Sequence, residues 1–205
     1  MGGMTPEPGK WSRMIAVDHE HSHRYVQRFR MMAQAGHDLV GEARTVHAML
    51  SPNSRVLDAG CGPGRHAEHL HSLGHRVVGV DVDPVLIAAA KDEHPGPEYV
   101  VQDLAELDLP AKGIEAGFDA ILCAGNVVGF LAESTRVDVL RRMGAHLAPE
   151  GRAVIGFGAG RGYGFGEFFD DVTAAGLAVQ LKLSTWDLRP FSPDSTFLVA
   201  VVGRA

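Results

Sequence analysis

Short apolar runs alternate with amphipathic segments along the middle of the chain, and this alternation constrains the fold more than any other feature. Each run is short and apolar enough for a strand buried on both faces. The segments between the runs have recognisable helix ends, since Asp83-Pro84 suits a helix start and Gly74 suits a helix end. This alternation predicts a parallel sheet with helices on both faces. The expected strands cover residues 55–57, 76–80, 99–101, 118–123 and 153–157.

The two ends of the chain break this alternation. Residues 177–183 and 196–202 predict two more strands, whose connection is too short for a crossover helix, so they should be antiparallel neighbours. Residues 28–50 have apolar positions at helical spacing and predict one helix. We therefore expect an N-terminal arm or irregular cap over residues 1–30. Residues 31–205 should form one α/β domain with a seven-stranded, mostly parallel sheet that ends in an antiparallel hairpin.

Composition limits the classes of function. The chain has 45% hydrophobic and 21% charged residues, which is typical of globular proteins, and no apolar run approaches the roughly 20 residues of a membrane helix. Residues 1–10 lack the apolar stretch of a signal peptide, so we expect a cytoplasmic protein without a membrane partner. The net charge of −6, without a concentrated basic run, argues against nucleic acid as a partner. Cys61 and Cys123 have no CxxC partner and should be reduced.

A glycine-rich turn follows the first predicted strand. Glycines at 60, 62 and 64 let the backbone pass close to a ligand, and the following helix offers free amides, although a tight turn without a ligand would use the same residues. Asp81 favours the ligand, because it ends the second strand 21 residues after Gly60, where a carboxylate accepts ribose hydroxyls. Asp83 suits the helix cap instead. Asp103, after the third strand, either accepts from an adenine amino group or is a solvated turn residue.

These motifs make the chain resemble the class I S-adenosylmethionine (SAM)-dependent methyltransferases. The resemblance covers about residues 50–205, through the segments VLDAGCGPGR, GVDVD, VVQDLAEL, FDAILCAGNVVGF and LAPEGRAVIGF. It implies a Rossmann-like, doubly wound α/β fold, with SAM as the cofactor and S-adenosylhomocysteine (SAH) as the product. The segment Asn126-Val127-Val128-Gly129 departs from the motif of DNA amino-methyltransferases, which argues against a nucleic-acid base as the acceptor.

The resemblance also implies roles for single residues. The loop at Gly60 would hold the methionine part of the cofactor, Asp81 the ribose and Asp103 the adenine, while the residues after the fourth strand would flank the sulfonium. Arg65 either pairs with the cofactor carboxylate or is solvated on the helix surface. The residues expected to bind the cofactor are Asp58, Ala59, Gly60, Cys61, Gly62, Gly64, Arg65, Asp81, Val82, Asp103, Leu104, Ala124, Gly125 and Asn126.

Candidate acceptor contacts follow the fifth and sixth strands. Residues 158–166, which include Tyr163, form either a mobile pocket wall or a surface loop. Trp186 and Arg189 suit a planar or anionic substrate, but a tryptophan packed at the sheet edge would look the same in the sequence. We therefore include Tyr163, Trp186 and Arg189 among the acceptor-side candidates.

The N-terminal arm offers further candidates. Residues 18–25, with His23 and Tyr25, either fold over the acceptor pocket or begin a solvated helix. His19 and His23 stand four residues apart, as metal ligands on a helix do. Without a cysteine or a second cluster of ligands, we expect no metal site.

The sequence as a whole predicts a methyltransferase that acts on a small molecule. The acceptor atom stays open between O, N and C, and no catalytic base is identifiable, because SAM carries its own activated methyl group. A SAM-binding protein without turnover is the first alternative, since a fold does not determine a function. An NAD-dependent dehydrogenase is disfavoured by Asp58 before the first glycine, by the GxGxG spacing and by the terminal hairpin. The oligomeric state stays open between monomer and homodimer.

Overall fold

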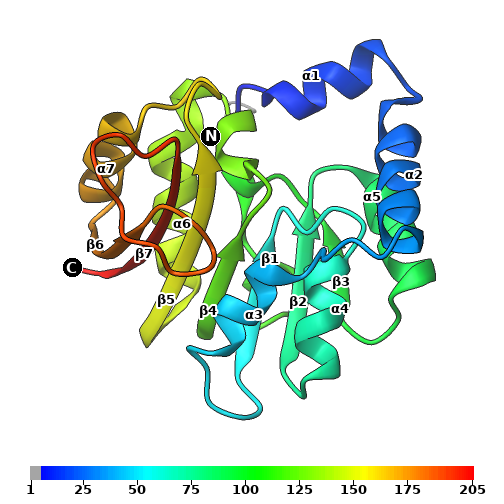
Figure 1. Cartoon of the computed structure of the whole chain (residues 1–205), viewed down its shortest axis with the longest axis horizontal. Coiled ribbons are helices and arrows are strands. Elements are labelled where there is room, and N and C mark those ends of the chain that lie inside the picture. The colour runs from blue at the N-terminus through cyan, green and yellow to red at the C-terminus, as the bar shows by residue number, and fades with distance from the viewer. Residues whose placement is uncertain (1–5) are drawn as a thin grey trace.

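One seven-stranded sheet organises residues 6–205, which are the residues described by the computed structural model. The first five residues of the predicted arm lie outside this range. The strand order is β3-β2-β1-β4-β5-β7-β6 (Figure 1). The strands are β1 (Arg55–Ala59), β2 (Arg76–Asp81), β3 (Glu98–Val101), β4 (Phe118–Cys123), β5 (Leu147–Gly158), β6 (Leu177–Leu183) and β7 (Phe197–Arg204).

The order of the strands places a reversal in the middle of the sheet. From β1 the chain moves outward to β2 and β3, and then returns to the other side of β1 to form β4 and β5, all in parallel. Ligands of such sheets bind beyond the carboxyl ends of the strands at this reversal. β7 lies between β5 and β6 and is antiparallel to both, so the predicted C-terminal hairpin is confirmed. β5 begins at Leu147, earlier than predicted, because the chain is already extended before Gly151 and bulges opposite β4.

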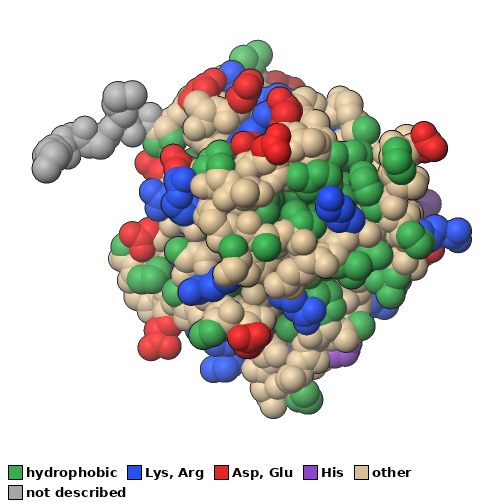
Figure 2. Space-filling view, turned by 90° about the vertical axis from the view of Figure 1, so that its left-hand side faces the viewer, with side chains coloured by type: hydrophobic (Ala, Val, Ile, Leu, Met, Phe, Trp, Pro, Cys, Tyr) green, Lys and Arg blue, Asp and Glu red, His purple; other side chains and the backbone are tan. Residues whose placement is uncertain are grey.

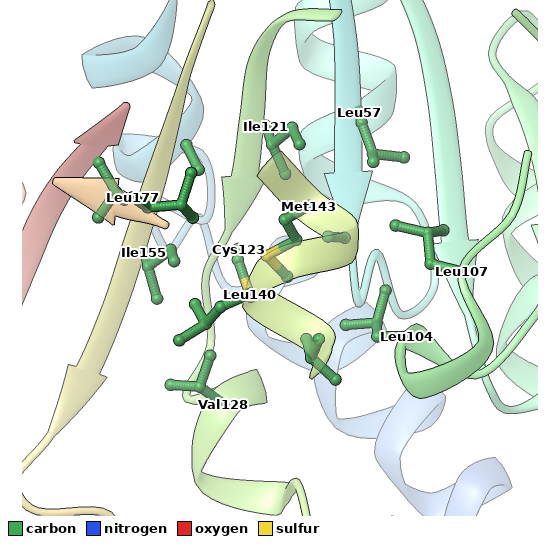
Figure 3. Packing of buried hydrophobic residues seen from close by; sticks show 14 of the residues in the cluster. Leu57, Leu104, Leu107, Ile121, Cys123, Val128, Leu140, Met143, Ile155 and Leu177 are labelled. Carbon is green, nitrogen blue, oxygen red and sulfur yellow. The ribbon is translucent and has the colours of Figure 1, made fainter. Parts of the chain in front are cut away.

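Helices cover both faces of the sheet, as predicted for a doubly wound fold. On one face, α3 (Gly41–His47), α4 (Arg65–Ser72) and α5 (Pro84–Glu93) bury apolar side chains. On the other face, α6 (Arg136–His146) and α7 (Phe165–Ala174) do so. Figure 3 shows Leu140 and Met143 of α6 packed against Ile121 and Cys123 of β4.

The structure corrects two predictions about the N-terminal part. The single helix expected over residues 28–50 is wrong: α2 (His21–Gln34) ends before Gly36, which has a φ of 76°, and α3 starts a new direction. Glycine adopts this left-handed conformation without steric cost, so it ends the helix despite the continuing apolar spacing. The irregular segment expected before residue 24 contains a further helix, α1 (Lys10–Val17). Figure 1 shows α1 above the sheet and α2 beside α5.

The predicted helix ends are confirmed. Asp83 caps α5, because its Oδ1 accepts a hydrogen bond from the Val85 amide at 2.8 Å. Gly74 follows α4 with a φ of 88°. Short 3-10 turns complete the loops: η1 (Leu104–Glu106), η2 (Pro110–Lys112), η3 (Val127–Phe130) and η4 (Glu133–Thr135).

The sheet edge formed by β6 is irregular. Its pairing with β7 shifts register between Val179 and Leu181, and such a bulge makes an exposed edge a poor template for another strand. Figure 2 views the molecule from the side on which α7 and β6 lie in Figure 1, and hydrophobic side chains are mixed there with charges of both signs. Between residues 6 and 205, no helix is both long and apolar enough to cross a bilayer.

Candidate functional site

A cavity of about 470 Å³ lies at the carboxyl ends of β1 to β4, under the N-terminal helices α1 and α2. This volume lies within the range of about 300–1,000 Å³ that is usual for small-ligand sites. Residues from the strand ends, the two helices and the loop after β5 line it. They are Gly9, Trp11, Ser12, Met14, His21, Arg24, Tyr25, Arg28, Gly60, Gly62, Asp81, Val82, Leu86, Asp103, Leu104, Gly125, Asn126, Val127, Phe130, Leu131 and Arg161.

The glycine turn after β1 passes close to the residues after β4. Gly60 has a φ of 81°, and a Cβ atom placed on it would lie 2.4 Å from a methyl carbon of Val127. Real Cβ atoms do not approach another carbon this closely, so position 60 has no room for a side chain. Gly60 and Gly62 both line the cavity, so the backbone of the turn is accessible to a ligand, as a ligand-binding loop requires.

Asp81 joins the end of β2 to this turn. Its Oδ2 accepts from the Gly62 amide at 2.9 Å, and its Oδ1 accepts from the Asp83 amide at 3.0 Å. Burial raises the pKa of the Asp81 carboxyl to about 6, although both amides act in the opposite direction. Asp81 is therefore largely ionised at neutral pH, and each oxygen keeps a lone pair for a further donor.

Asp103 and Asn126 complete the strand-end wall. Asp103 Oδ1 accepts from the Ala105 amide at 2.9 Å, which leaves the other carboxylate oxygen for a ligand. Asn126 has a φ of 65°, and its Oδ1 accepts from the Gly158 amide at 2.8 Å. This bond holds the end of β4 against the end of β5. Val82, Leu104 and Gly125 also line the cavity, so four neighbouring strand ends contribute to one wall.

The remaining residues predicted to bind the cofactor do not line the cavity. Asp58 is buried behind the glycine turn, where burial raises its pKa, and its Oδ2 has no hydrogen-bond partner within residues 6–205. Arg65 points toward α3, where it pairs with Glu42 at 3.4 Å and donates to the Leu39 carbonyl. The other residues of this group are Ala59, Cys61, Gly64 and Ala124, which are buried beneath the lining residues.

Among the predicted acceptor-side residues, Tyr25 lines the cavity and His23 does not. His23 is exposed on the outer side of α2. Tyr163 is buried, since its hydroxyl donates to Asp171 at 2.7 Å and its ring packs against Phe157. It therefore belongs to the hydrophobic core instead of to the lining of the cavity.

The two candidates that follow β6 also lie outside the cavity lining. The Trp186 ring packs on Gly156 of β5, where it leaves no space for a side chain. Arg189 pairs with Asp187 at 3.3 Å, and both side chains are exposed. Across residues 6–205, no group of three or more His, Cys, Asp or Glu side chains is arranged to hold a metal ion.

Several residues that line the cavity were not predicted from the sequence, among them Trp11, His21, Arg28 and Phe130. Trp11 lies at their centre, with ring centroids of His21 at 4.9 Å, Tyr25 at 5.2 Å and Phe130 at 5.8 Å from its own. Arg28 stacks over the Tyr25 ring at 5.2 Å. The signal that could have found Trp11 was an aromatic side chain in an otherwise polar arm.

Two contacts fasten the cap to the sheet domain. The fully buried Asp83 accepts hydrogen bonds at its Oδ2 from the Trp11 indole, at 2.9 Å, and from the Ser22 hydroxyl. On the opposite side of the cavity, Lys10 Nζ donates to the Gly129 and Arg161 carbonyls, each at 3.0 Å. We call these contacts the Asp83 latch and the Lys10 anchor. Together they hold α1 across the top of the cavity.

Comparison with known proteins gives the family. A family model described as a methyltransferase domain matches residues 56–151. Among curated relatives, magnesium-protoporphyrin O-methyltransferase from Rhodobacter capsulatus is 32% identical over 132 residues, which is 60% of this chain and 52% of that protein. A dTDP-amino-sugar N,N-dimethyltransferase from Streptomyces fradiae is 28% identical over 125 residues, which is 58% of this chain and 47% of that protein. The chain thus spans about half the length of these relatives.

Solved structures overlap with more of the chain. A 1,6-didemethyltoxoflavin-N1-methyltransferase from Burkholderia thailandensis, 22% identical, covers 99% of this chain and 93% of its own with a TM-score of 0.65, which supports the fold. A TehB-like SAM-dependent methyltransferase from Corynebacterium glutamicum is 45% identical, covers 92% of this chain and 100% of its own, and has a TM-score of 0.87. On this evidence the chain belongs to the SAM-dependent methyltransferase family.

Proposed function

We propose that this protein transfers the methyl group of SAM to a small-molecule acceptor inside the cavity. One observation carries the proposal: a single cavity joins the strand-end wall, with Asp81 and Asp103, to Trp11 and Tyr25 of the N-terminal helices and to Arg161 after β5. A protein that only bound the cofactor would need the first wall alone. Aromatic and polar side chains beside the ends of β4 and β5 support an acceptor pocket, and therefore an enzyme.

The strand-end wall suits the parts of SAM in the order in which the strands lie. The ionised Asp81 would accept both ribose hydroxyls, and Asp103 would accept from the adenine amino group. Leu86 and Leu104 would contact the adenine ring. The backbone at Gly60, Gly62 and Gly125 would lie along the methionine part, where no Cβ atom intrudes. The residues present thus fit the cofactor in charge and in shape.

Arg28 is a better partner for the cofactor carboxylate than Arg65. Arg65 already pairs with Glu42, whereas Arg28 lines the cavity and has no carboxylate within 4.0 Å among residues 6–205. Arg28 stacks on Tyr25, whose ring would lie 3.8 Å from a Cβ atom placed on Gly62. Arg28 and Gly62 thus both lie near the Tyr25 ring, which supports Arg28 as the partner. We therefore assign the carboxylate contact to Arg28.

The protein's contribution to the reaction is orientation and exclusion of water. When bound, SAM would supply an activated methyl group, and its transfer to the acceptor would leave SAH with the electron pair of the broken sulfur–carbon bond. Asn126, held against Gly158, fixes the end of β4 beside this reaction. The Asp83 latch and the Lys10 anchor close the cap over both molecules, which aligns the acceptor and lowers the entropic part of the barrier.

Calorimetric titration with SAM and SAH tests the cofactor assignment. Asp81→Ala should weaken binding by at least about 1.5–3 kcal/mol, which is the usual contribution of hydrogen bonds to a charged group. Asp81→Asn, which keeps the side-chain volume, should lose most of the same affinity. Asp108→Ala is the matched control, because the Asp108 carboxylate also accepts a hydrogen bond from a backbone amide, that of Ala111, and lies outside the cavity lining. Unchanged affinity in both Asp81 variants would refute the ribose assignment.

Release of SAH in the presence of acceptors separates an enzyme from a binding protein. A panel of small hydroxylated and amino-bearing compounds should include at least one that yields SAH and a methylated product. Trp11→Ala should lower this turnover while SAM affinity changes little. Binding of SAM with no turnover across neutral, cationic and anionic acceptors would favour the binding protein.

A further inference from the structure

Two cavity arginines, Arg28 and Arg161, lack the partners that most arginines of the chain have. Within residues 6–205, every arginine except Arg28, Arg76 and Arg161 donates a side-chain hydrogen bond or pairs with a carboxylate. Arg76 begins β2, at the end of the sheet opposite the cavity. A guanidinium has five donors in a planar fork that matches a carboxylate, so an unpaired one beside a cavity indicates an anionic ligand.

The cofactor can account for only one of these two arginines. SAM has one carboxylate, and the proposed function assigns it to Arg28. Arg161 follows β5 instead, and a Cβ atom placed on Gly129 would lie 3.0 Å from the Arg161 Cβ. Arg161 therefore stands over η3, on the β4–β5 side of the cavity. This is the side on which we place the acceptor.

The acidic side chains of the cavity lining lie at one end, whereas its arginines lie on α2 (Arg24 and Arg28) and after β5 (Arg161). The acidic lining residues are Asp81 and Asp103, which follow β2 and β3 at the end assigned to ribose and adenine. At the opposite end, the Lys10 anchor adds a second positive charge, because Lys10 Nζ donates to the Arg161 carbonyl at 3.0 Å. No carboxylate lies within 4.0 Å of Lys10 or Arg161 among the described residues. The acceptor end of the cavity is thus positive.

Rings and apolar side chains line the space between the two ends. The Trp11 and Phe130 rings meet edge to face with centroids 5.8 Å apart, and both line the cavity together with Met14 and Leu131. Aromatic side chains bind planar rings well, through large contact areas and favourable edge-to-face geometry. A ligand that fills this space and reaches the positive acceptor end therefore combines a planar ring with a negative charge.

We propose that the methyl acceptor is a planar aromatic molecule that carries an anionic group, and that Arg161 binds this group while Trp11 and Phe130 contact the ring. This inference rests on the proposed function, since it concerns the acceptor of the same reaction. It makes Arg161 a specificity-determining residue of the acceptor. The side chain is available for this role, because the Lys10 anchor uses only the backbone carbonyl of Arg161.

Calorimetry on the protein loaded with SAH tests the proposal with three probes. The probes are 4-hydroxybenzoate, its neutral counterpart 4-hydroxybenzamide, and acetate, which has the charge without the ring. We expect 4-hydroxybenzoate to bind at least about tenfold more tightly than either of the others, as one charged hydrogen-bonded pair suggests. Arg161→Gln should remove the preference for the acid over the amide, and Arg161→Lys should keep part of it.

Arg76→Gln is the matched control, because it removes the same charge from an exposed, unpaired arginine outside the cavity. It should leave all three affinities unchanged. The proposal would be overturned if the acid and the amide bound equally, or if acetate bound as tightly as the aromatic acid. It would also be overturned if Arg161→Gln kept the preference for the acid, or if no probe bound. Failure of SAH itself to bind would instead refute the proposed function, so the two failures are distinguishable.

Discussion

The two halves of the cavity are built in different ways. The strand-end half consists of turns that directly follow β1, β2, β3 and β4, and its carboxylates are held by backbone amides of their own turn or of the neighbouring one. The cap half brings together distant segments: the Trp11–Asp83 bond spans 72 residues and the Lys10–Arg161 bond spans 151. The comparison teaches that cofactor geometry is a local property of the sheet in this fold, whereas acceptor geometry depends on long-range docking.

The largest expected effect concerns the strand-end half. Gly60→Ala should cost about 1–2 kcal/mol for the left-handed backbone and a further 1–3 kcal/mol, roughly, for the collision with Val127. Denaturant unfolding measures the total loss of stability, and titration with SAM should show loss of binding. Gly113→Ala is the control, because Gly113 has a φ of 80° and nothing within 4 Å of its Cβ position. A Gly60→Ala protein as stable as this control would show that the turn is not tightly packed.

A smaller effect is expected from the cap half. Trp11→Phe keeps the ring cluster but removes the hydrogen bond to Asp83, so α1 should open more readily by about 1.5–3 kcal/mol. Hydrogen exchange of the α1 amides measures this opening. Trp186→Phe is the matched change outside the cavity and should leave α1 protected. If the free energy of SAM binding fell by as much as the free energy of α1 opening, the two halves of the cavity would not respond separately.

The two halves should also differ in their response to pH. Because the pKa of Asp81 is raised to about 6 in the folded protein from 3.8, its contribution to stability is present below pH 4 and is lost as the pH rises through 6. SAM needs the ionised carboxylate, so its affinity should fall roughly tenfold between pH 7 and pH 5. Asp81→Asn should flatten this profile. Probe binding at Arg161 should barely change over the same range, since arginine does not titrate there.

The smallest effect is expected at Arg189. This arginine forms an exposed pair with Asp187, and such pairs contribute little to stability. Arg189→Ala should therefore change the unfolding free energy by less than about 0.5 kcal/mol and leave SAM and probe affinities unaltered. A clear loss of probe affinity in this variant would mean that the acceptor site extends beyond the cavity described above.

Much of the sheet was predictable because its signals are local. The spacing between Gly60 and Asp81 follows from one strand–helix–strand unit, and the short connection before β7 leaves an antiparallel hairpin as the simplest arrangement. The break after α2 was missed because apolar spacing continues on both sides of Gly36, and only the left-handed backbone there separates the helices. The fold was therefore more predictable than the helix boundaries.

The candidate site was predictable only where side chains follow the sheet. Arg65 stands at the start of α4, where a cofactor contact was expected, but Glu42 from α3 attracts it away from the cavity. A tryptophan and an arginine were expected together in the acceptor pocket, and the sequence pointed to Trp186 and Arg189 as neighbours. The pair that lines the cavity is Trp11 and Arg161, whose association no periodicity reveals.

The Asp83 latch has a consequence for synthesis in the cell. The ribosome delivers α1 and α2 before the sheet, and their buried acceptor, Asp83, emerges only after β1, α4 and β2, because the Ser22 and Trp11 contacts span 61 and 72 residues. Until then, the Trp11 indole has nothing to bind. We therefore expect α1 and α2 to dock after the strands that follow them, and to stay accessible to chaperones until the central strands have assembled.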